Sequence, residues 1–142
     1  MLTPFRLGVG GRVGSGRQWM SWIHVEDVAS AIRFAIDNSS LSGPVNATAP
    51  AAVPNAEFTK TLGRVLRRPT LFPAPGFAMH LAFGEMAGEI LLGGQRVLPR
   101  KLAAAGFTFR FPTLEPALRN ILLGTPAAPV ASGAREGAAQ TV

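Results

Sequence analysis

The chain has 142 residues, 47% of them hydrophobic and 15% charged, so it is long enough to bury one sizeable core. It contains no cysteine, which excludes disulfides, thiolate metal sites and cysteine nucleophiles and permits a reducing compartment. Every apolar run is interrupted by Gly, Pro, Arg or Glu, and the first residues lack a signal-peptide core, so we expect no membrane association and a cytoplasmic location. The formal net charge of +6 raises nucleic acid as a partner, but no aromatic residues alternate with the basic clusters around Arg64–Arg68 and Arg96–Lys101, which favours a solvated basic face.

The first third of the sequence predicts a loop, a strand and a helix. Five glycines between positions 8 and 16 make residues 1–18 a predicted loop, because ordering glycine in a helix or strand is entropically costly. Residues 19–25 are bulky and β-prone, which predicts a strand. Asp27 is the expected N-cap of the helix that follows, to about Asp37, although an acidic site residue is the alternative. Its predicted apolar stripe is Val28, Ala31, Ile32, Ala35 and Ile36.

The next segment repeats the strand and helix order. After a turn at Gly43–Pro44, residues 45–48 form a short strand candidate, and Pro54–Asn55 opens a helix that Arg68–Pro69 ends. The alternation of strand and helix predicts a doubly wound parallel sheet in an α/β protein.

The last third is predicted to be mostly helical. Residues 70–72 and 107–111 read as short strands, and residues 85–92, 99–105 and 113–123 as helices, the second of them closed by Gly106. Residues 124–142 are small, polar and patternless, which predicts a disordered tail.

The glycine loop contains two incomplete phosphate-binding patterns. Gly8, Gly11 and Gly14 approach a dinucleotide fingerprint, but such a loop follows a buried strand and opens a helix, and Pro4 breaks the preceding segment. In the comparison with a P-loop, Arg17 stands in place of the lysine and Gln18 in place of the hydroxyl residue. The sequence therefore predicts no cofactor-binding residue in this chain, and a flexible loop at the edge of a cleft fits better.

The residues offer no complete catalytic or metal constellation. His24 and His80 are the only histidines and have no metal-ligand spacing, so we expect His24 to bond to nearby backbone and His80 to be an ordinary helix residue. Ser15 and Ser21 lack the G-x-S-x-G elbow of hydrolases. No catalytic residue and no metal ligand are therefore predicted.

Three blocks in order carry a family resemblance: PFRLGVGGRVGSGRQWMSWIHVEDVASAI, GPVNATAPAAVPNAEFTKTLGRVLRRP and LLGGQRVLPRKLAAAGFTFRFPTLEPAL. Together they resemble the carboxyl-terminal half of atypical extended short-chain dehydrogenase/reductases, called NAD(P)-dependent or nucleoside-diphosphate-sugar epimerases. The third block is similar to the small domain of unknown function that ends such proteins. The resemblance covers roughly residues 2–123.

This resemblance implies a fold and a domain division. Residues 1–69 would be the carboxyl-terminal remainder of a Rossmann-like doubly wound sheet with the substrate cleft, residues 70–123 the small, mostly helical substrate-side domain, and residues 124–142 the tail. Family members carry a cofactor loop for NADP or NAD in an amino-terminal half, and use a Tyr-x-x-x-Lys pair as acid and base. This chain contains no tyrosine and no such cofactor loop, so we expect no turnover and no cofactor binding by the chain alone.

The resemblance also implies four substrate-cleft candidates. Arg17 could pair with a phosphate or carboxylate, Gln18 offers a donor and an acceptor, and Trp22 offers a stacking face, with Asn46 near them. The structural alternatives are a solvated charge, a loop fastener, a core side chain and a turn-end hydrogen bond, respectively.

Two functions remain open from the sequence. The chain is either the substrate-side carboxyl-terminal portion of an NAD(P)-dependent epimerase or reductase, or a noncatalytic binding or oligomerisation module. Its expected partners are the missing Rossmann half or a second copy of itself, together with a small-molecule substrate that no residue identifies.

Overall fold

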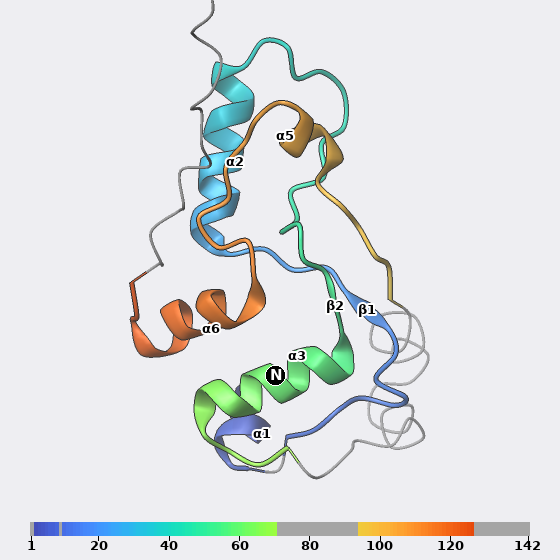
Figure 1. The fold of residues 1–142 in the computed structure, drawn as a ribbon, viewed down its shortest axis with the longest axis vertical. Helices are drawn as coiled ribbons and strands as arrows, with labels where there is room; N and C mark the ends of the chain where they lie inside the picture. The colour runs from blue at the N-terminus through green and yellow to red at the C-terminus, as the bar shows by residue number, and fades with distance from the viewer. Residues whose placement is uncertain (1, 9, 71–93, 127–142) are drawn as a thin grey trace, which may run out of the picture.

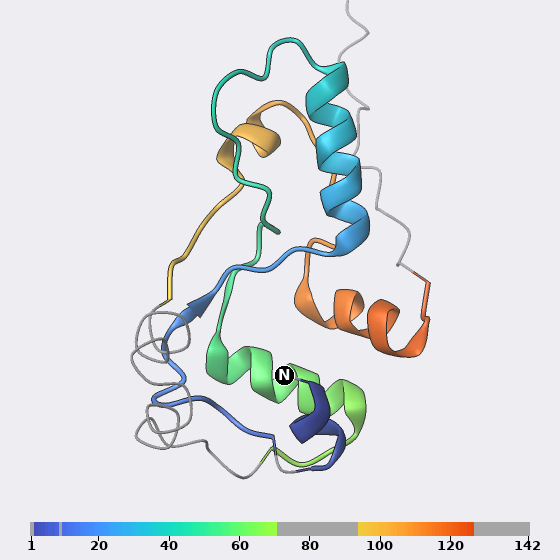
Figure 2. The same ribbon diagram turned by 180° about the vertical axis from the view of Figure 1, so that it is seen from behind.

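The computed structural model describes residues 2–8, 10–70 and 94–126, with the elements drawn in Figure 1. In chain order they are α1 (Leu2–Arg6), β1 (Trp19–Met20), α2 (Val25–Asp37), β2 (Val53–Pro54), α3 (Asn55–Leu66), α5 (Arg100–Ala104) and α6 (Leu114–Leu123). Helices α2 and α5 occupy one end of the molecule, whereas α3, α6 and α1 occupy the other, and the strand pair lies between them (Figures 1 and 2). The prediction of a mixed α/β fold is confirmed.

Local end signals place three helices where the sequence predicts them. Helix α3 begins after Pro54 and ends at Arg67, which adopts the left-handed conformation with φ of 53°. Helix α6 ends at Gly124, also left-handed with φ of 69°, so that an orphan carboxyl-terminal carbonyl is satisfied. Helix α5 is followed by Gly106 with φ of 83°, as its predicted stop signal requires. Residues 2–6, predicted as loop, form the short helix α1 instead.

The strands differ from the prediction in direction and length. Strands β1 and β2 pair antiparallel, Trp19 with Pro54 and Met20 with Val53, so this pair differs from the predicted parallel sheet. Strand β2 also lies after the strand predicted at residues 45–48. After α2 the chain turns back along the segment it came from, and bonds from Ala49 N to Trp22 O and from Asn55 N to Gln18 O continue the antiparallel contact. The ladder is short because a proline, which has no N–H to donate, stands in it.

Other strand predictions also fail or fall outside the structure. Residues 45–48 and 107–111 form no strand, and residues 21–24 continue from β1 without strand pairing. Residues 71–72, 85–92 and 127–142, for which predictions were made, and His80 lie outside the described residues.

The cap of α2 is His24 rather than Asp27. The Nδ1 atom of His24 accepts a hydrogen bond from the amide of Glu26 at 3.2 Å, which confirms that this histidine bonds to nearby backbone. Asp27 is the third residue of the helix and is only 1% exposed. Its two carboxylate oxygens accept hydrogen bonds from the amides of Arg110 at 2.7 Å and Phe111 at 2.9 Å. Its partners are thus distant in sequence and belong to another segment.

The core forms where this segment meets α2. Phe111 is fully buried and stacks on the ring of His24, with 3.9 Å between ring centroids. Because Nδ1 of His24 accepts a bond, its Nε2 carries the hydrogen and donates to Asn120 Oδ1 at 3.0 Å, which connects α6 to the same core. Alongside, one hydrophobic cluster contains Ala31, Leu102 and Phe109, with Ile23, Phe34, Leu41, Val45 and Phe107 packed against it.

The apolar stripe predicted on α2 is divided between two environments. Ala31 is buried in the core, whereas Ile32 and Ile36 are 55% and 78% exposed. Val25 is 69% exposed and lies seven residues before Ile32, so the three side chains share one face of the helix. Helix α2 is therefore apolar on two sides, and the described residues cover one of them.

Helices α3 and α6 pack together and share an ion-pair network. Glu115 receives side-chain hydrogen bonds from Arg119, four residues later on α6, and from Arg64 on α3. These bonds from Arg119 and Arg64 lower the pKa of Glu115. The pairs are exposed, so their contribution to stability is modest.

Within the described ranges, no helix combines the length and the apolar character that a membrane span requires.

The predicted N-cap role of Asp27 and its observed role as acceptor of the Arg110 and Phe111 amides imply different effects of Asp27→Asn. An N-cap tolerates Asn almost as well as Asp. In the observed site, Asn would lose the charge and turn its NH₂ group toward one of two buried amides, so we expect a loss of about 2 kcal/mol or more. Urea unfolding followed by circular dichroism measures the change, with Asp37→Asn at the exposed end of α2 as control. Equal unfolding midpoints for the two variants would contradict the assignment.

A basic pocket beside the strand pair

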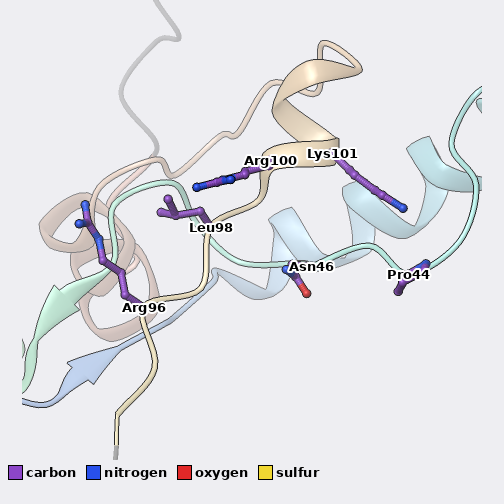
Figure 3. A pocket seen from close by; sticks show the side chains of 6 residues that line it. All are labelled: Pro44, Asn46, Arg96, Leu98, Arg100 and Lys101. Atoms are coloured by element: carbon purple, nitrogen blue, oxygen red, sulfur yellow. The ribbon is translucent and has the colours of Figure 1, made fainter.

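Three cationic side chains line one pocket, shown in Figure 3. The pocket measures about 280 Å³ and lies between the segment after α2 and the segment that leads into α5. Its lining residues are Pro44, Asn46, Arg96, Leu98, Arg100 and Lys101. No acidic residue is among them.

The three cations are held differently. The Cζ atom of Arg96 lies 4.7 Å from the ring centroid of Trp19, a cation–π distance. Lys101 Nζ donates to the carbonyl of Ser42 at 2.8 Å. Figure 3 shows Arg96 and Arg100 extending to the side of Leu98, whereas Lys101 extends toward Pro44. The ion pairs found among the described residues use Arg64, Arg110 and Arg119, so these three pocket cations have no carboxylate partner there.

The segment that carries Arg96 is tied to the strand region. Ser21 Oγ donates to the carbonyl of Gln95 at 2.7 Å and accepts from the amide of Val97 at 2.9 Å. The carbonyl of Val97 also accepts a bond from Thr48 Oγ1 at 3.4 Å. At Gly94 an added Cβ would lie 2.5 Å from the backbone of Trp19, so only glycine permits this close approach.

The four predicted cleft residues do not gather at one place. Asn46 lines the basic pocket. Arg17 is exposed, whereas Gln18 is partly buried and its Nε2 donates to Val13 O at 3.0 Å. Trp22 Nε1 donates to Ala51 O at 2.7 Å, so the indole is fixed to the returning chain. A cleft role for these four residues stays a prediction.

Sequence reasoning missed the pocket cations because their partners in space are distant in the chain. The sequence alone indicates only a solvated basic face for Arg96, Arg100 and Lys101. Ser21 holds the segment that carries Arg96 through bonds to Gln95 and Val97, which are 74 and 76 residues away in sequence. Ser21 lacks a nucleophile motif, and its observed role is structural, which no local pattern indicates.

The glycine loop is packed against α3 rather than shaped around a ligand. The amide of Val13 donates to Asn55 Oδ1 at 2.9 Å, and the carbonyl of Gly16 accepts from Ala56 N at 2.9 Å. A Cβ at Gly16 would lie 3.0 Å from that of Ala56, and the φ of Gly16 is +70°. Gly16 therefore serves a close contact between the loop and α3.

Comparison with known proteins gives concordant matches. Residues 9–47 match the NAD dependent epimerase/dehydratase family, and residues 74–121 match a domain of unknown function, DUF1731. Epimerase family protein YfhF of Bacillus subtilis is 46% identical over 122 residues, covering 86% of this chain and 40% of that protein. The human epimerase family protein SDR39U1 is 41% identical, covering 86% of this chain and 42% of that protein. The chain thus spans about 40% of the length of these relatives.

Solved structures agree. The crystal structure of human SDR39U1 with NADPH superposes with a TM-score of 0.82 at 40% identity, over 88% of this chain and 42% of that chain. A nucleoside-diphosphate sugar epimerase from Corynebacterium glutamicum gives a TM-score of 0.65 at 29% identity.

These matches define the class first: the chain has the architecture of part of a Rossmann-like α/β protein of the NAD-dependent epimerase kind. More particularly, it is homologous to the epimerase family proteins represented by SDR39U1 and YfhF, and it corresponds to a portion of them.

The ties through Ser21 generate a prediction for Ser21→Ala. The substitution removes two hydrogen bonds that fix residues 95–97, so we expect a loss of about 1–2 kcal/mol and faster exchange of the Val97 amide. Hydrogen exchange measured by NMR tests this. Ser40→Ala is the matched control, because Ser40 Oγ bonds only to Asn38, two residues away. Unchanged exchange at Val97 would show that Ser21 does not hold the segment.

Proposed function

We propose that this chain is the substrate-side portion of an NAD(P)-dependent epimerase- or reductase-like protein, and that it acts only together with the rest of the family fold. NADP or NAD would then bind to that other portion. The sequence has no tyrosine to serve as the proton-transfer residue of such enzymes, and the glycine loop is occupied by its contacts with α3. The chain's own contribution would be to bind and orient the substrate.

The observation that carries this proposal is the exposed apolar face of α2. Val25, Ile32 and Ile36 lie on one side of a helix whose opposite side is already in the core. Helices of doubly wound folds cover sheet faces, so an apolar face that the described residues leave exposed supports the proposal that a further layer packs against α2. The NADPH-bound relative has more than half of its chain beyond the part matched here, which is enough protein to supply that layer.

Four side chains are proposed to contact the substrate, namely Arg17, Gln18, Trp22 and Asn46. Asn46 is supported by its place in the basic pocket. Trp22 is supported by the bond to Ala51, which fixes its ring orientation. Of the remaining two, Arg17 offers an exposed charge and Gln18 a partly buried amide.

The same face of α2 supports the alternative, a noncatalytic oligomerisation module. Two copies of the chain could cover each other's stripe. The two functions differ in whether the remaining family portion binds in preference to a second copy.

Complementation tests the proposed function. By calorimetry, the chain alone should show no NADPH binding tighter than about 10 µM. Addition of the portion of the Bacillus subtilis relative that this chain does not match should give a stable complex that binds NADPH and supports its oxidation with candidate carbonyl substrates. Tight NADPH binding by the chain alone would refute the proposal. A stable homodimer that ignores the added portion would favour the oligomerisation module.

A charge on the exposed stripe should weaken the complex. Ile32→Lys and Ile36→Lys each put a cation into the contact, and we expect at least a tenfold loss in affinity for the complementing portion. Ser30→Lys adds the same charge on another side of α2 and should leave the affinity unchanged. Isothermal calorimetry gives the three affinities, and circular dichroism verifies the fold of each variant. Equal affinities for all three would place the contact elsewhere.

A further inference from the structure

We propose that a second pocket, formed where α3 and α6 end, binds the carboxylate of a small aliphatic acid, with Arg67 as its main ligand. The two helices pack together and end on the same side of the molecule (Figures 1 and 2). The pocket measures about 380 Å³ and shares no lining residue with the basic pocket. Its lining residues are Arg64, Val65, Leu66, Arg67, Arg119 and Leu123. The site is built from this chain alone and does not depend on the proposed function.

Arg67 has a backbone conformation that favours glycine. It follows α3 with φ of 53° and ψ of 42°, and among the residues that the structure describes it is the one non-glycine residue with a positive φ. A Cβ atom is strained in this left-handed conformation, and the equivalent position after α6 is a glycine, Gly124. Strain of this kind is concentrated at sites that bind ligands. An arginine at position 67 therefore points to a role for its side chain that offsets the strain.

The side chain of Arg67 is not needed to close α3. The amide of Arg67 donates to the carbonyl of Arg64 at 3.1 Å. The amide of Arg68 donates to the carbonyl of Gly63 at 2.9 Å. Backbone groups thus satisfy these terminal carbonyls. No ion pair within the described ranges involves Arg67, so its guanidinium is left for a ligand.

Positive charge exceeds negative charge at this end of the two helices. Arg64 of α3 and Arg119 of α6 both bond to Glu115, at 2.7 and 2.8 Å, so one carboxylate serves two arginines. The bond from Arg119 first, and then the bond from Arg64, lower the pKa of Glu115, as neighbouring cations do. Arg67 adds a third cation to the same pocket. Gathered cations concentrate positive potential, which a further anion would reduce.

The lining favours a monoanion that carries an aliphatic chain. Val65, Leu66 and Leu123 are apolar and can contact such a chain. Arg64 bonds to Glu115 through one terminal nitrogen, and a guanidinium has further N–H donors that suit a second carboxylate. A dianion would be repelled more strongly by Glu115, and an amino acid would bring an ammonium group beside the arginines. The volume lies within the roughly 300–1,000 Å³ usual for small-molecule sites.

Calorimetry on the full chain with hexanoate, acetate, hexanol and hexylamine tests the ligand class. At constant ionic strength hexanoate should bind saturably, and acetate about tenfold more weakly, because acetate lacks the chain that contacts the aliphatic residues. Hexanol and hexylamine should show no saturable binding, since neither offers a carboxylate. Amide shifts in the NMR spectrum of the wild-type chain should cluster at residues 64–67 and 119–123, which locates the site without any substitution.

The variant Arg67→Gly separates binding from stability. Glycine relieves the left-handed strain, so the urea midpoint should rise, whereas hexanoate binding should weaken by about fivefold or more because the guanidinium is lost. Arg67→Lys keeps a charge without the fork and should retain part of the affinity. Arg68→Gln is the matched control, because Arg68 is an exposed neighbour that does not line the pocket, and it should change neither quantity.

Three results would overturn the proposal. The first is hexanoate binding that does not saturate, maps to other residues or weakens equally in Arg68→Gln. The second is an Arg67→Gly variant that gains stability and keeps its affinity for hexanoate. The third is tighter binding of a capped Leu-Glu peptide at the same residues, which would replace the free acid by the acidic side chain of a partner protein.

Discussion

The carboxylate of Asp27 holds α2 against the segment that contains Arg110 and Phe111, and the core forms around this contact. It joins α2 to a segment 84 residues later by accepting two backbone amides, while almost completely removed from water. Burying a charge is costly unless hydrogen bonds replace its hydration, and here two amides do so, assisted by the positive amino-terminal end of α2. The bonds fix Phe111 beneath His24 and direct Phe109 and Phe107 toward Phe34. One side chain of α2 thereby holds two consecutive backbone amides of the segment that crosses the helix.

Residues that line the basic pocket are adjacent in sequence to residues packed in this core. Val45 packs against the hydrophobic cluster, and its neighbour Asn46 lines the pocket. Leu102 is fully buried in the same cluster, and Arg100 and Lys101 precede it at the start of α5. Exposed cationic side chains are thus placed by buried apolar neighbours one or two residues away. The remaining cation, Arg96, has a separate support in Ser21 and Trp19, because it lies before α5 begins.

The features that depend on interactions between residues close in sequence could be predicted, whereas those that depend on residues distant in sequence could not. Helices α3 and α6 end at left-handed residues, and the left-handed Gly106 follows the end of α5, so proline, glycine and periodicity were sufficient to find these helices. The direction of the strand pair depends on how the chain returns after α2, which no residue in either strand encodes. Asp27 was read as a cap because its local position permits that role, yet its partners are distant amides. The pocket escaped notice for the same reason, since only the fold brings Arg96 and Arg100 beside Asn46.

Covering the exposed stripe on α2, formed by Val25, Ile32 and Ile36, would also increase the stability of the fold. Full burial of a Val or Ile side chain stabilises by about 1.5–3 kcal/mol, and Val25, Ile32 and Ile36 each retain more than half of their exposure. Covering the three would therefore contribute on the order of 3–6 kcal/mol. Net stabilities of domains are about 5–15 kcal/mol, so the layer that covers α2 would add a substantial fraction of the stability of this fold. The bonds of Asp27 hold the opposite side of α2 against residues 110 and 111, so the stripe of Val25, Ile32 and Ile36 is the side that stays available to such a layer.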